Sequence, residues 1–347
     1  MKLNWIVSDI ENKIKNVKLS HDEVSIKNQF IYGKMLSDLS YTSSTKKNHI
    51  SREDFFERLN EFELSYFYNP FFNLINEIYK YISDYDYEFE YAEYEYMEPE
   101  NVIKVCKDFY KQGDKDSFTM FKRILKSDNS IQYIDNRDLS FLGRTYYISQ
   151  DEYYILINGR NYLENIIATI HECKHVDMYL RGYNKGLPIY NELAPIIYEM
   201  NMIDYLEKID DIGNLKINNI NKYIQLIRKI GFQINLIKDL KSTKHESDSF
   251  ELIYNNYEQI YDEYRIEELY NVLNVGYSRS VIGKIISFIV GLDIYINGSQ
   301  NNINNLITCY IFGIYKLEPS ILDDVLEYIN QIYKCYDKEK IKKKIEK

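Results

Sequence analysis

The sequence predicts a mainly α-helical protein with one small β-hairpin. Proline and glycine are scarce, at 5 and 13 of 347 residues, so few positions are expected to break a helix. Apolar residues recur every three or four positions along most of the chain, which is the spacing of an amphipathic helix. The segment 141–158 is the exception, because its aromatic and apolar residues favour extended chain.

The net charge argues against nucleic acid as a partner. The chain has 43 Lys and Arg residues against 53 Asp and Glu residues, which gives a formal net charge of −10. A surface of this sign repels a phosphate backbone and suits neutral or cationic ligands.

Cysteine usage and the apolar runs favour a cytoplasmic protein. Near the N-terminus only three apolar residues stand together before Asp9, so no signal peptide is expected. The longest apolar run, 285–292, is too short to cross a bilayer, so we expect no membrane association. Four cysteines lie far apart without a CxxC pair, as is typical of a reducing compartment: Cys106, Cys173, Cys309 and Cys335.

The chain is expected to divide near residue 97. Residues 1–96 would form an N-terminal helical region, a reduced lid or lobe, in which 52–80 keeps one apolar face at helical spacing. Within the same region, 83–98 alternates acidic and aromatic side chains, which suits either a strand or an exposed linker. Residues 97–347 would form a larger helical domain that contains the hairpin.

The larger domain opens with a helix that starts at Pro99, since proline is favoured in a first helical turn. The hairpin follows at 141–158, where FLGRTYYIS and EYYILIN flank a turn at Gln150 and Asp151. A second helix is expected over 163–180. The buried stripe of the first helix is expected to contain Val102, Ile103, Cys106, Phe109 and Tyr110.

Polar and glycine-rich stretches predict three loops, at 181–188, 241–250 and 297–305. The lysine-rich segment from Lys338 is typical of the solvated end of a last helix, where cations suit the helix dipole.

The helix at 163–180 contains the motif HExxH, from His171 to His175. Histidines four residues apart lie one turn apart on the same helix face, so both imidazoles can reach one tetrahedral metal ion. Glu172, beside the first histidine, would act on a water molecule at that ion. Because the chain has only five histidines, chance would produce this pattern in roughly 1% of such sequences.

A catalytic zinc ion usually takes three protein ligands and leaves one position open, so a third ligand is needed. Glu192 is the best candidate, because it follows the 186–188 loop and opens a new helical period. Glu199, on roughly the same face, would accept a hydrogen bond from a ligand histidine, or else would be a surface carboxylate. The buried face of this helix is expected to contain Leu193, Ile196, Ile197 and Met200.

The remaining metal-binding residue types are expected to be structural. Cys173 lies between the two histidines but on another face of the helix, so we expect a packed thiol and not a ligand. His21, His49 and His245 are expected at the surface.

These motifs resemble the thimet oligopeptidase and oligoendopeptidase F group of zinc metallopeptidases. The segments 154–158 and 166–172 are similar to the edge strand and the start of the zinc helix in that family. The segment 192–199 is similar to the helix that carries the third ligand and a second glutamate. Two tyrosines in 270–277, with a glycine before the second, keep the family spacing, and the resemblance covers about 97–290.

The resemblance implies a mainly α, helical zincin-type fold with a small sheet or hairpin beside the zinc helix. It implies one Zn²⁺ ion held by His171, His175 and Glu192, with Glu172 as general base. Tyr277 and Tyr270 would hydrogen-bond the substrate carbonyl and the oxyanion it becomes. Both tyrosines have packing as an alternative, since the chain contains 36 tyrosines.

The resemblance also implies that the strand around 153–158 pairs with an extended peptide, as an exposed sheet edge does in strand addition. Tyr154, Ile155 and Ile157 would then bind substrate. Arg265 stands where the family usually has a histidine; it can donate hydrogen bonds to an oxyanion but cannot exchange a proton near neutral pH. The chain is also shorter than typical members, so a restriction to short peptides is in question.

The expected function is therefore zinc-dependent hydrolysis of internal bonds in short or unstructured peptides, by a metal-activated water. A peptide is the expected partner; the sequence leaves the oligomeric state open. One alternative is an inactive zinc-fold binding protein, which the arginine and the short N-terminal part favour. Another is a metallocarboxypeptidase, in which Arg265 or Arg279 would hold the terminal carboxylate.

Overall fold

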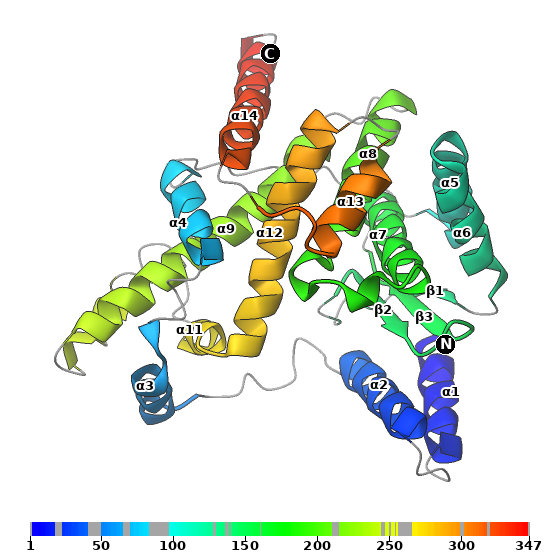
Figure 1. Ribbon diagram of the computed structural model, residues 1–347, viewed down its shortest axis with the longest axis horizontal. Helices are drawn as coiled ribbons and strands as arrows, with labels where there is room; N and C mark the ends of the chain where they lie inside the picture. Colours follow the sequence, from blue (N-terminus) through cyan, green and yellow to red (C-terminus); the bar gives the residue numbers. More distant parts are fainter. Residues whose placement is uncertain are drawn as a thin grey trace. The chain divides into compact units, whose positions relative to one another are not determined.

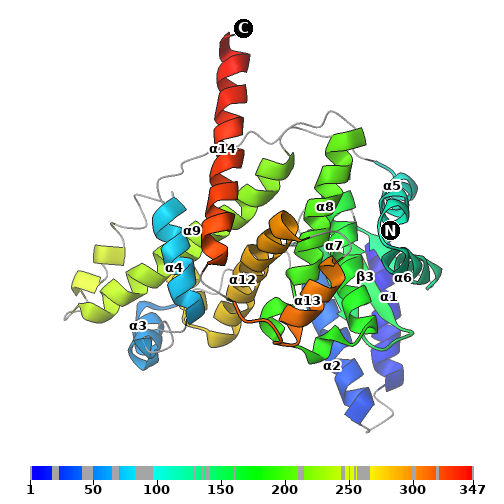
Figure 2. The same ribbon diagram turned by 45° about the horizontal axis from the view of Figure 1, so that its top comes forward.

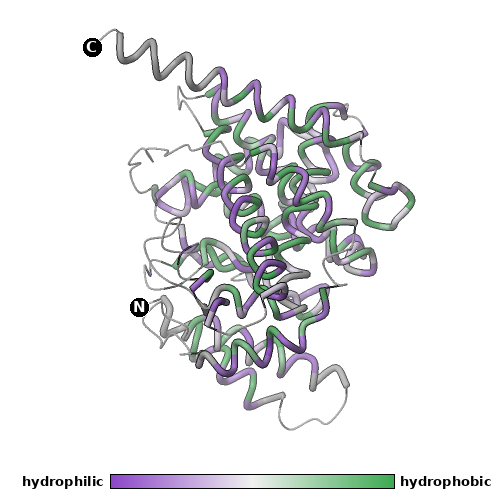
Figure 3. Tube along the Cα trace, turned by 90° about the vertical axis from the view of Figure 1, so that its left-hand side faces the viewer, coloured by the Kyte–Doolittle hydropathy of each residue, from purple (hydrophilic) through white to green (hydrophobic). Residues whose placement is uncertain are grey.

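The structure is a computed structural model that consists of helices and one small three-stranded sheet (Figure 1). Hydrophilic and hydrophobic positions alternate along the helices, as expected for amphipathic segments (Figure 3). The described residues are 2–17, 23–40, 50–64, 70–82, 97–127, 130–134, 136, 139, 141–159, 161–209, 215–243, 247–249, 251–253, 255, 266–298, 302–317 and 320–345.

The chain forms two compact units, each built from three stretches of sequence. Unit 1 consists of Met1–Thr45, Tyr91–Lys185 and Ala194–Asp211. Unit 2 consists of Lys46–Glu90, Gly186–Leu193 and Ile212–Lys347. The expected division between 96 and 97 stays a prediction.

Two helices of unit 1 begin at a residue whose side chain caps them. Asp114 caps α6 by accepting a hydrogen bond of 2.8 Å from the backbone N–H of Ser117, and Asn161 caps α7 by accepting one of 3.0 Å from that of Glu164. The helix predicted to start at Pro99 does start there. The helices are α1 (Lys2–Val17), α2 (Glu23–Ser40), α5 (Pro99–Gln112), α6 (Lys115–Lys126), α7 (Tyr162–Leu180) and α8 (Leu193–Ile209), with a 3₁₀ turn η2 (Tyr183–Lys185).

The sheet of unit 1 has the strand order β1-β3-β2. The predicted hairpin is confirmed as the antiparallel pair β2 (Gly143–Tyr147) and β3 (Tyr153–Ile157). A third strand, β1 (Ile131–Tyr133), pairs in parallel with β3 on its other side. Because β3 is the central strand, all five of its residues are buried.

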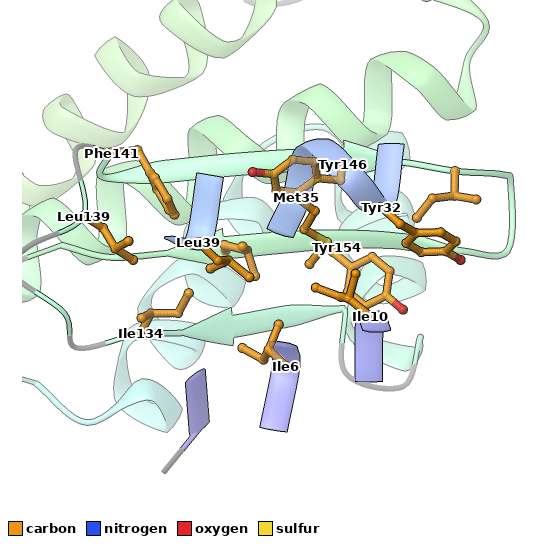
Figure 4. Close-up of a cluster of buried hydrophobic side chains, with 12 residues drawn as sticks. Ile6, Ile10, Tyr32, Met35, Leu39, Ile134, Leu139, Phe141, Tyr146 and Tyr154 are labelled. Carbon is orange, nitrogen blue, oxygen red and sulfur yellow. The ribbon is translucent and has the colours of Figure 1, made fainter. Parts of the chain in front are cut away.

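The two faces of the sheet are covered by different helices. Side chains alternate along a strand, so Thr145 and its partner Ile155 point to the face on which α7 lies. Tyr154 and Leu156 point to the opposite face, where α1 and α2 pack (Figure 4). The buried cluster on that face contains Ile6, Ile10, Tyr32, Met35, Leu39, Ile134, Leu139, Phe141, Tyr146, Ile148, Tyr154 and Leu156.

Polar contacts at the edge of this cluster fix the two N-terminal helices to the hairpin. Glu152, beside the hairpin turn, accepts hydrogen bonds of 2.6 Å from Lys13 and 2.7 Å from Tyr32. Tyr146 donates a hydrogen bond of 2.6 Å to Asp38. The N-terminal helices α1 and α2 are therefore part of the layer that supports the sheet.

Unit 2 consists of helices. The single apolar face expected over 52–80 belongs to two helices, since α3 ends at Glu61, where Phe62 takes an extended conformation. The elements of unit 2 are α3 (Arg52–Glu61), α4 (Pro70–Ile82), η3 (Pro188–Tyr190), α9 (Leu215–Ser242), α11 (Ile266–Val272), α12 (Val275–Asn297), α13 (Ile303–Ile311) and α14 (Ile321–Ile345).

Of the predicted loops, 181–188 agrees with these bounds, whereas both ends of 297–305 and most of the described residues of 241–250 are helical. The chain turns between Leu180 and Leu193 with only short 3₁₀ pieces, and α13 begins five residues after Gly298. In the 241–250 loop, 247–249 is helical and 244–246 lies outside the described residues. The acidic and aromatic repeat also lies outside them over 83–96, and so do the side chains of the lysine-rich tail.

One helix corrects the expectation that no segment is long enough to cross a membrane. In the part of the chain that the structure describes, Ser280–Asn297 of α12 meets the length and composition of a span, with a mean hydropathy of 1.5. However, 61% of it is buried inside the structure. Core helices pass the same test, so this is weak evidence for a membrane span.

Replacing Met35 by Ala should loosen the sheet of unit 1. Met35 is fully buried against it, and such a truncation typically costs about 2–5 kcal/mol. Amide hydrogen exchange in β3 should accelerate accordingly, since it reports the opening of this unit alone. Lys34→Ala, an exposed neighbour on α2, is the control. Equal exchange in the two variants would contradict the assigned packing.

Candidate metal centre

Helix α7 places two imidazoles side by side. His171 and His175 lie one helical turn apart, and their Nε2 atoms are 3.1 Å from each other. The rings are tilted by 72° with centroids 4.8 Å apart, so both nitrogens point toward a common position. Two nitrogens that share a tetrahedral zinc ion are separated by about 3.3 Å, so this spacing fits a metal.

Glu192, the residue immediately before α8, completes the donor set. The ligand atoms of His171, His175 and Glu192 all lie within 4.8 Å of one another, and all three residues are half-buried. Two imidazoles and one carboxylate are a common set for catalytic zinc, and they leave one coordination position open. The residues therefore fit the ion that the motif predicts.

Glu199 orients the first histidine. Its Oε1 lies 2.6 Å from Nδ1 of His171, and its side chain is 3% exposed. An ionised carboxylate can only accept a hydrogen bond, so Nδ1 carries the proton. The lone pair of His171 is then on Nε2, the atom that faces His175. This is the contact expected for Glu199, which is buried and not a surface carboxylate.

Glu172 points toward strand β2. Its side chain is 7% exposed, and its Oε2 lies 2.7 Å from Oγ1 of Thr145. Gly143, two residues earlier in β2, leaves room for this carboxylate, because a Cβ there would lie 2.7 Å from its Cγ and Oε1. Neither β2 residue was predicted, since nothing in the segment GRTYY indicates that Thr145 contacts a helical residue 27 positions later.

A cluster of charged side chains, two of them buried, lies on the same helix as the histidines. The sequence did not predict it either. Lys174 is 3% exposed and contacts Asp177 at 2.6 Å, while Arg181 contacts the other oxygen of Asp177 at 2.5 Å. The Lys174 ammonium also lies 3.8 Å from the ring centroid of Tyr198, on α8. Burial opposes the charge, but Tyr198 and Asp177 outweigh it and raise the pKa of Lys174.

This group connects three helices. The hydroxyl of Tyr198 lies 2.7 Å from Oγ of Ser117 and donates a hydrogen bond of 3.0 Å to Asp114, so α6 is joined to α8. Tyr198 directly precedes Glu199, and Lys174 directly precedes His175. Two contacts therefore fix α7 to α8, Lys174 with Tyr198 and His171 with Glu199. The two helices lie side by side in Figure 2.

Cys173 is a packed thiol, as expected. It is 1% exposed, and burial raises its pKa well above the usual value for a cysteine. A protonated thiol is a poor metal ligand.

Several predicted residues are not part of the described cluster. Tyr270 is half-buried on α11, and Tyr277 belongs to α12, both in unit 2; the side chain of Tyr277 is not among the described parts. Arg265 lies outside the described residues, and His21, His49 and His245 do too. Their roles stay predictions.

The prediction that β3 pairs with a peptide was wrong. Strand β3 is hydrogen-bonded on both edges, to β1 and β2, so Tyr154, Ile155 and Ile157 have no free backbone edge. Tyr154 instead belongs to the cluster under α1 and α2. The sequence could not reveal the error, because β1 has only three residues and no recognisable pattern. The strand next to Glu172 is β2, and no described strand pairs with its other edge.

Solved structures share this fold. A protein from Bacillus anthracis str. Ames, described as a putative oligoendopeptidase F, is similar with a TM-score of 0.51 at 11% identity, over 91% of this chain and 67% of that one. A second structure, described in the same words, has a TM-score of 0.50 at 10% identity, over 96% and 75%. No protein-family model and no curated protein matches the sequence. The predicted fold class, mainly helical with a small sheet, is confirmed.

Replacing Glu199 by Gln should weaken zinc binding by about 10–100-fold, because the amide no longer fixes the proton on Nδ1 of His171. Competition with a chromophoric chelator measures this affinity. Glu207→Gln, an exposed change of the same kind on α8, should leave the affinity unchanged. If the two variants bind zinc equally well, Glu199 does not orient the ligand.

Proposed function

We propose that the protein is a zinc-dependent peptidase that hydrolyses internal bonds of short or unstructured peptides. The observation that supports this most is the group of His171, His175 and Glu192, with Glu172 directly after His171 in the chain. The likeness to structures described as oligoendopeptidase F, which by itself shows the fold alone, agrees with the proposal. So does the resemblance of the motifs.

The metal ligands are His171, His175 and Glu192, and Glu199 keeps the first histidine in the binding tautomer. A zinc ion bound there would lower the pKa of a water molecule and polarise the scissile carbonyl. The half-buried setting limits competing water and strengthens interactions with charge.

Glu172 is the general base. It accepts the proton of the attacking water and then passes it to the leaving amine. Thr145 holds Oε2 at 2.7 Å, so the carboxylate has little rotational freedom, and Oε1 is the oxygen beside Gly143. An ordered carboxylate needs no rearrangement during proton transfer, which supports this role.

The peptide substrate adds to the edge of β2 with which no described strand pairs. Backbone hydrogen bonds along an edge recognise an extended chain of any sequence, which suits unstructured peptides. Gly143 and Thr145 contact Glu172 from this strand, so a peptide bond paired there lies close to the general base.

Tyr277 and Tyr270 donate hydrogen bonds to the oxyanion. This assignment comes from the resemblance and carries packing as its alternative. Arg265 is a further donor by the same resemblance.

The protein is also proposed to act in the cytoplasm. Cys106, Cys173 and Cys309 are free thiols in the structure, which suits a reducing compartment.

Glu172→Gln should keep stoichiometric zinc but abolish cleavage of a mixed peptide library, because an amide cannot accept the proton. Product masses and metal content of the purified variant are measured together. Glu164→Gln, on the same helix, serves as the matched control and should cleave normally. Retained cleavage in Glu172→Gln would exclude it as the base, and zinc without cleavage in the unaltered protein would favour the inactive binding protein.

Tyr277→Phe should lower kcat by about 100- to 1,000-fold with little change in KM, since an oxyanion donor acts mainly in the transition state. Steady-state kinetics on one cleaved peptide separate the two constants. Tyr315→Phe, an exposed tyrosine of the same unit, is the comparison. An unchanged kcat would leave Tyr277 as a packing residue.

A further inference from the structure

Two stacked tyrosines lie beyond the candidate metal centre on the same strand and helix. Tyr147, the last residue of β2, and Tyr179 on α7 have ring centroids 4.6 Å apart and an interplanar angle of 9°. Tyr179 is 36% exposed and Tyr147 is half-buried, so the pair keeps accessible aromatic surface. Neither ring has a role in the proposed chemistry.

The pair is aligned with the metal ligands along α7. Tyr179 follows His175 by four residues and His171 by eight, so the three side chains form one stripe on the helix. Gly143, Thr145 and Tyr147 likewise alternate onto the face of β2 that meets α7. Gly143 and Thr145 lie against Glu172, and Tyr147 is the next residue on the same face of β2. The stacked pair is therefore the next feature along this strand after Glu172.

A peptide added to the edge of β2 would bring a side chain to the pair. Directly opposed residues in neighbouring strands point to the same face of a sheet, so the substrate residue opposite Tyr147 points to the side of α7. It is two residues from the substrate residue opposite Thr145, a distance of about 6.6 Å. Edge-strand recognition gains its sequence specificity from such contacts with alternate side chains.

The surroundings of the pair favour an uncharged side chain. Burial is the largest cause that raises the pKa of Tyr147, while Arg123 lowers it and Asp151 raises it. Because these neighbouring charges have opposite signs, neither a cationic nor an acidic side chain gains a clear advantage. The ring surfaces remain as the main attraction, and they suit aromatic or large apolar groups.

We infer that Tyr147 and Tyr179 form a binding site for one aromatic or large apolar side chain of the peptide, two residues from the position opposite Thr145. This inference rests on the proposed function and specifies its substrate class. It makes the enzyme selective at one position and tolerant elsewhere.

The test uses peptides that differ at one position at a time, with Phe, Leu, Ala or Asp at each of three positions on either side of the cleaved bond. The unaltered protein should prefer Phe or Leu by roughly tenfold in kcat/KM at one position only. Tyr179→Ala should reduce that preference to about twofold or less while cleaving the Ala peptide almost as well. Tyr179→Phe should keep the preference.

Phe30→Ala, which removes an exposed ring from α2, should change neither the preference nor the rate. An unchanged preference in Tyr179→Ala would overturn the inference, and so would an equal fall for all peptides, which indicates a structural role. Either result leaves the peptidase proposal intact.

Binding to Glu172→Gln gives a readout without turnover. Fluorescence anisotropy of labelled Phe and Ala peptides should show roughly tenfold tighter binding of the Phe peptide, and Tyr179→Ala in this background should remove the difference. If the unaltered protein cleaves nothing, the proposed function fails, and the anisotropy result still decides the side-chain site. Equal binding of both peptides would overturn it.

Discussion

The hydrogen bond between His171 and Glu199 is the contact on which the candidate site depends. At 2.6 Å it fixes the imidazole proton on Nδ1 and leaves Nε2 available to a metal ion. It also ties α7, which carries both histidines, to α8, whose start is preceded by Glu192. The ligand set therefore depends on how these two helices meet.

A buried lysine, Lys174, determines how α7 packs against α8. A lysine that is 3% exposed is costly to bury, and such groups seldom add to stability even when paired. Lys174 has Asp177 and the Tyr198 ring as partners, and these partners come from fixed positions on the two helices. With only apolar contacts, α7 could shift along α8. The contact between Lys174 and Tyr198 instead favours a single alignment of the two helices. The position of Glu199 opposite His171 follows from that alignment.

Much of the site was predictable because its residues are close in sequence. The two histidines and Glu172 lie within five residues of one helix, and the spacing of 192–199 gave Glu192 and Glu199. The features that were predicted wrongly or not at all depend on contacts between residues far apart in the sequence. The role of β3 was misassigned because β1, only three residues long, joins its other edge, and the contact of Thr145 with Glu172 spans 27 positions. The buried Lys174 also departs from the usual expectation that lysine is solvated.

X-ray absorption at the zinc edge of the purified protein tests the central claim most directly, because it reports the ligands of the ion and not the consequences of binding. The predicted spectrum has one zinc ion with only nitrogen and oxygen neighbours at about 2.0–2.1 Å and the outer-shell scattering of two imidazoles. A sulfur neighbour at about 2.3 Å would contradict this account, because it would make Cys173 or another thiol a ligand. A spectrum with fewer than two imidazoles would contradict it as well.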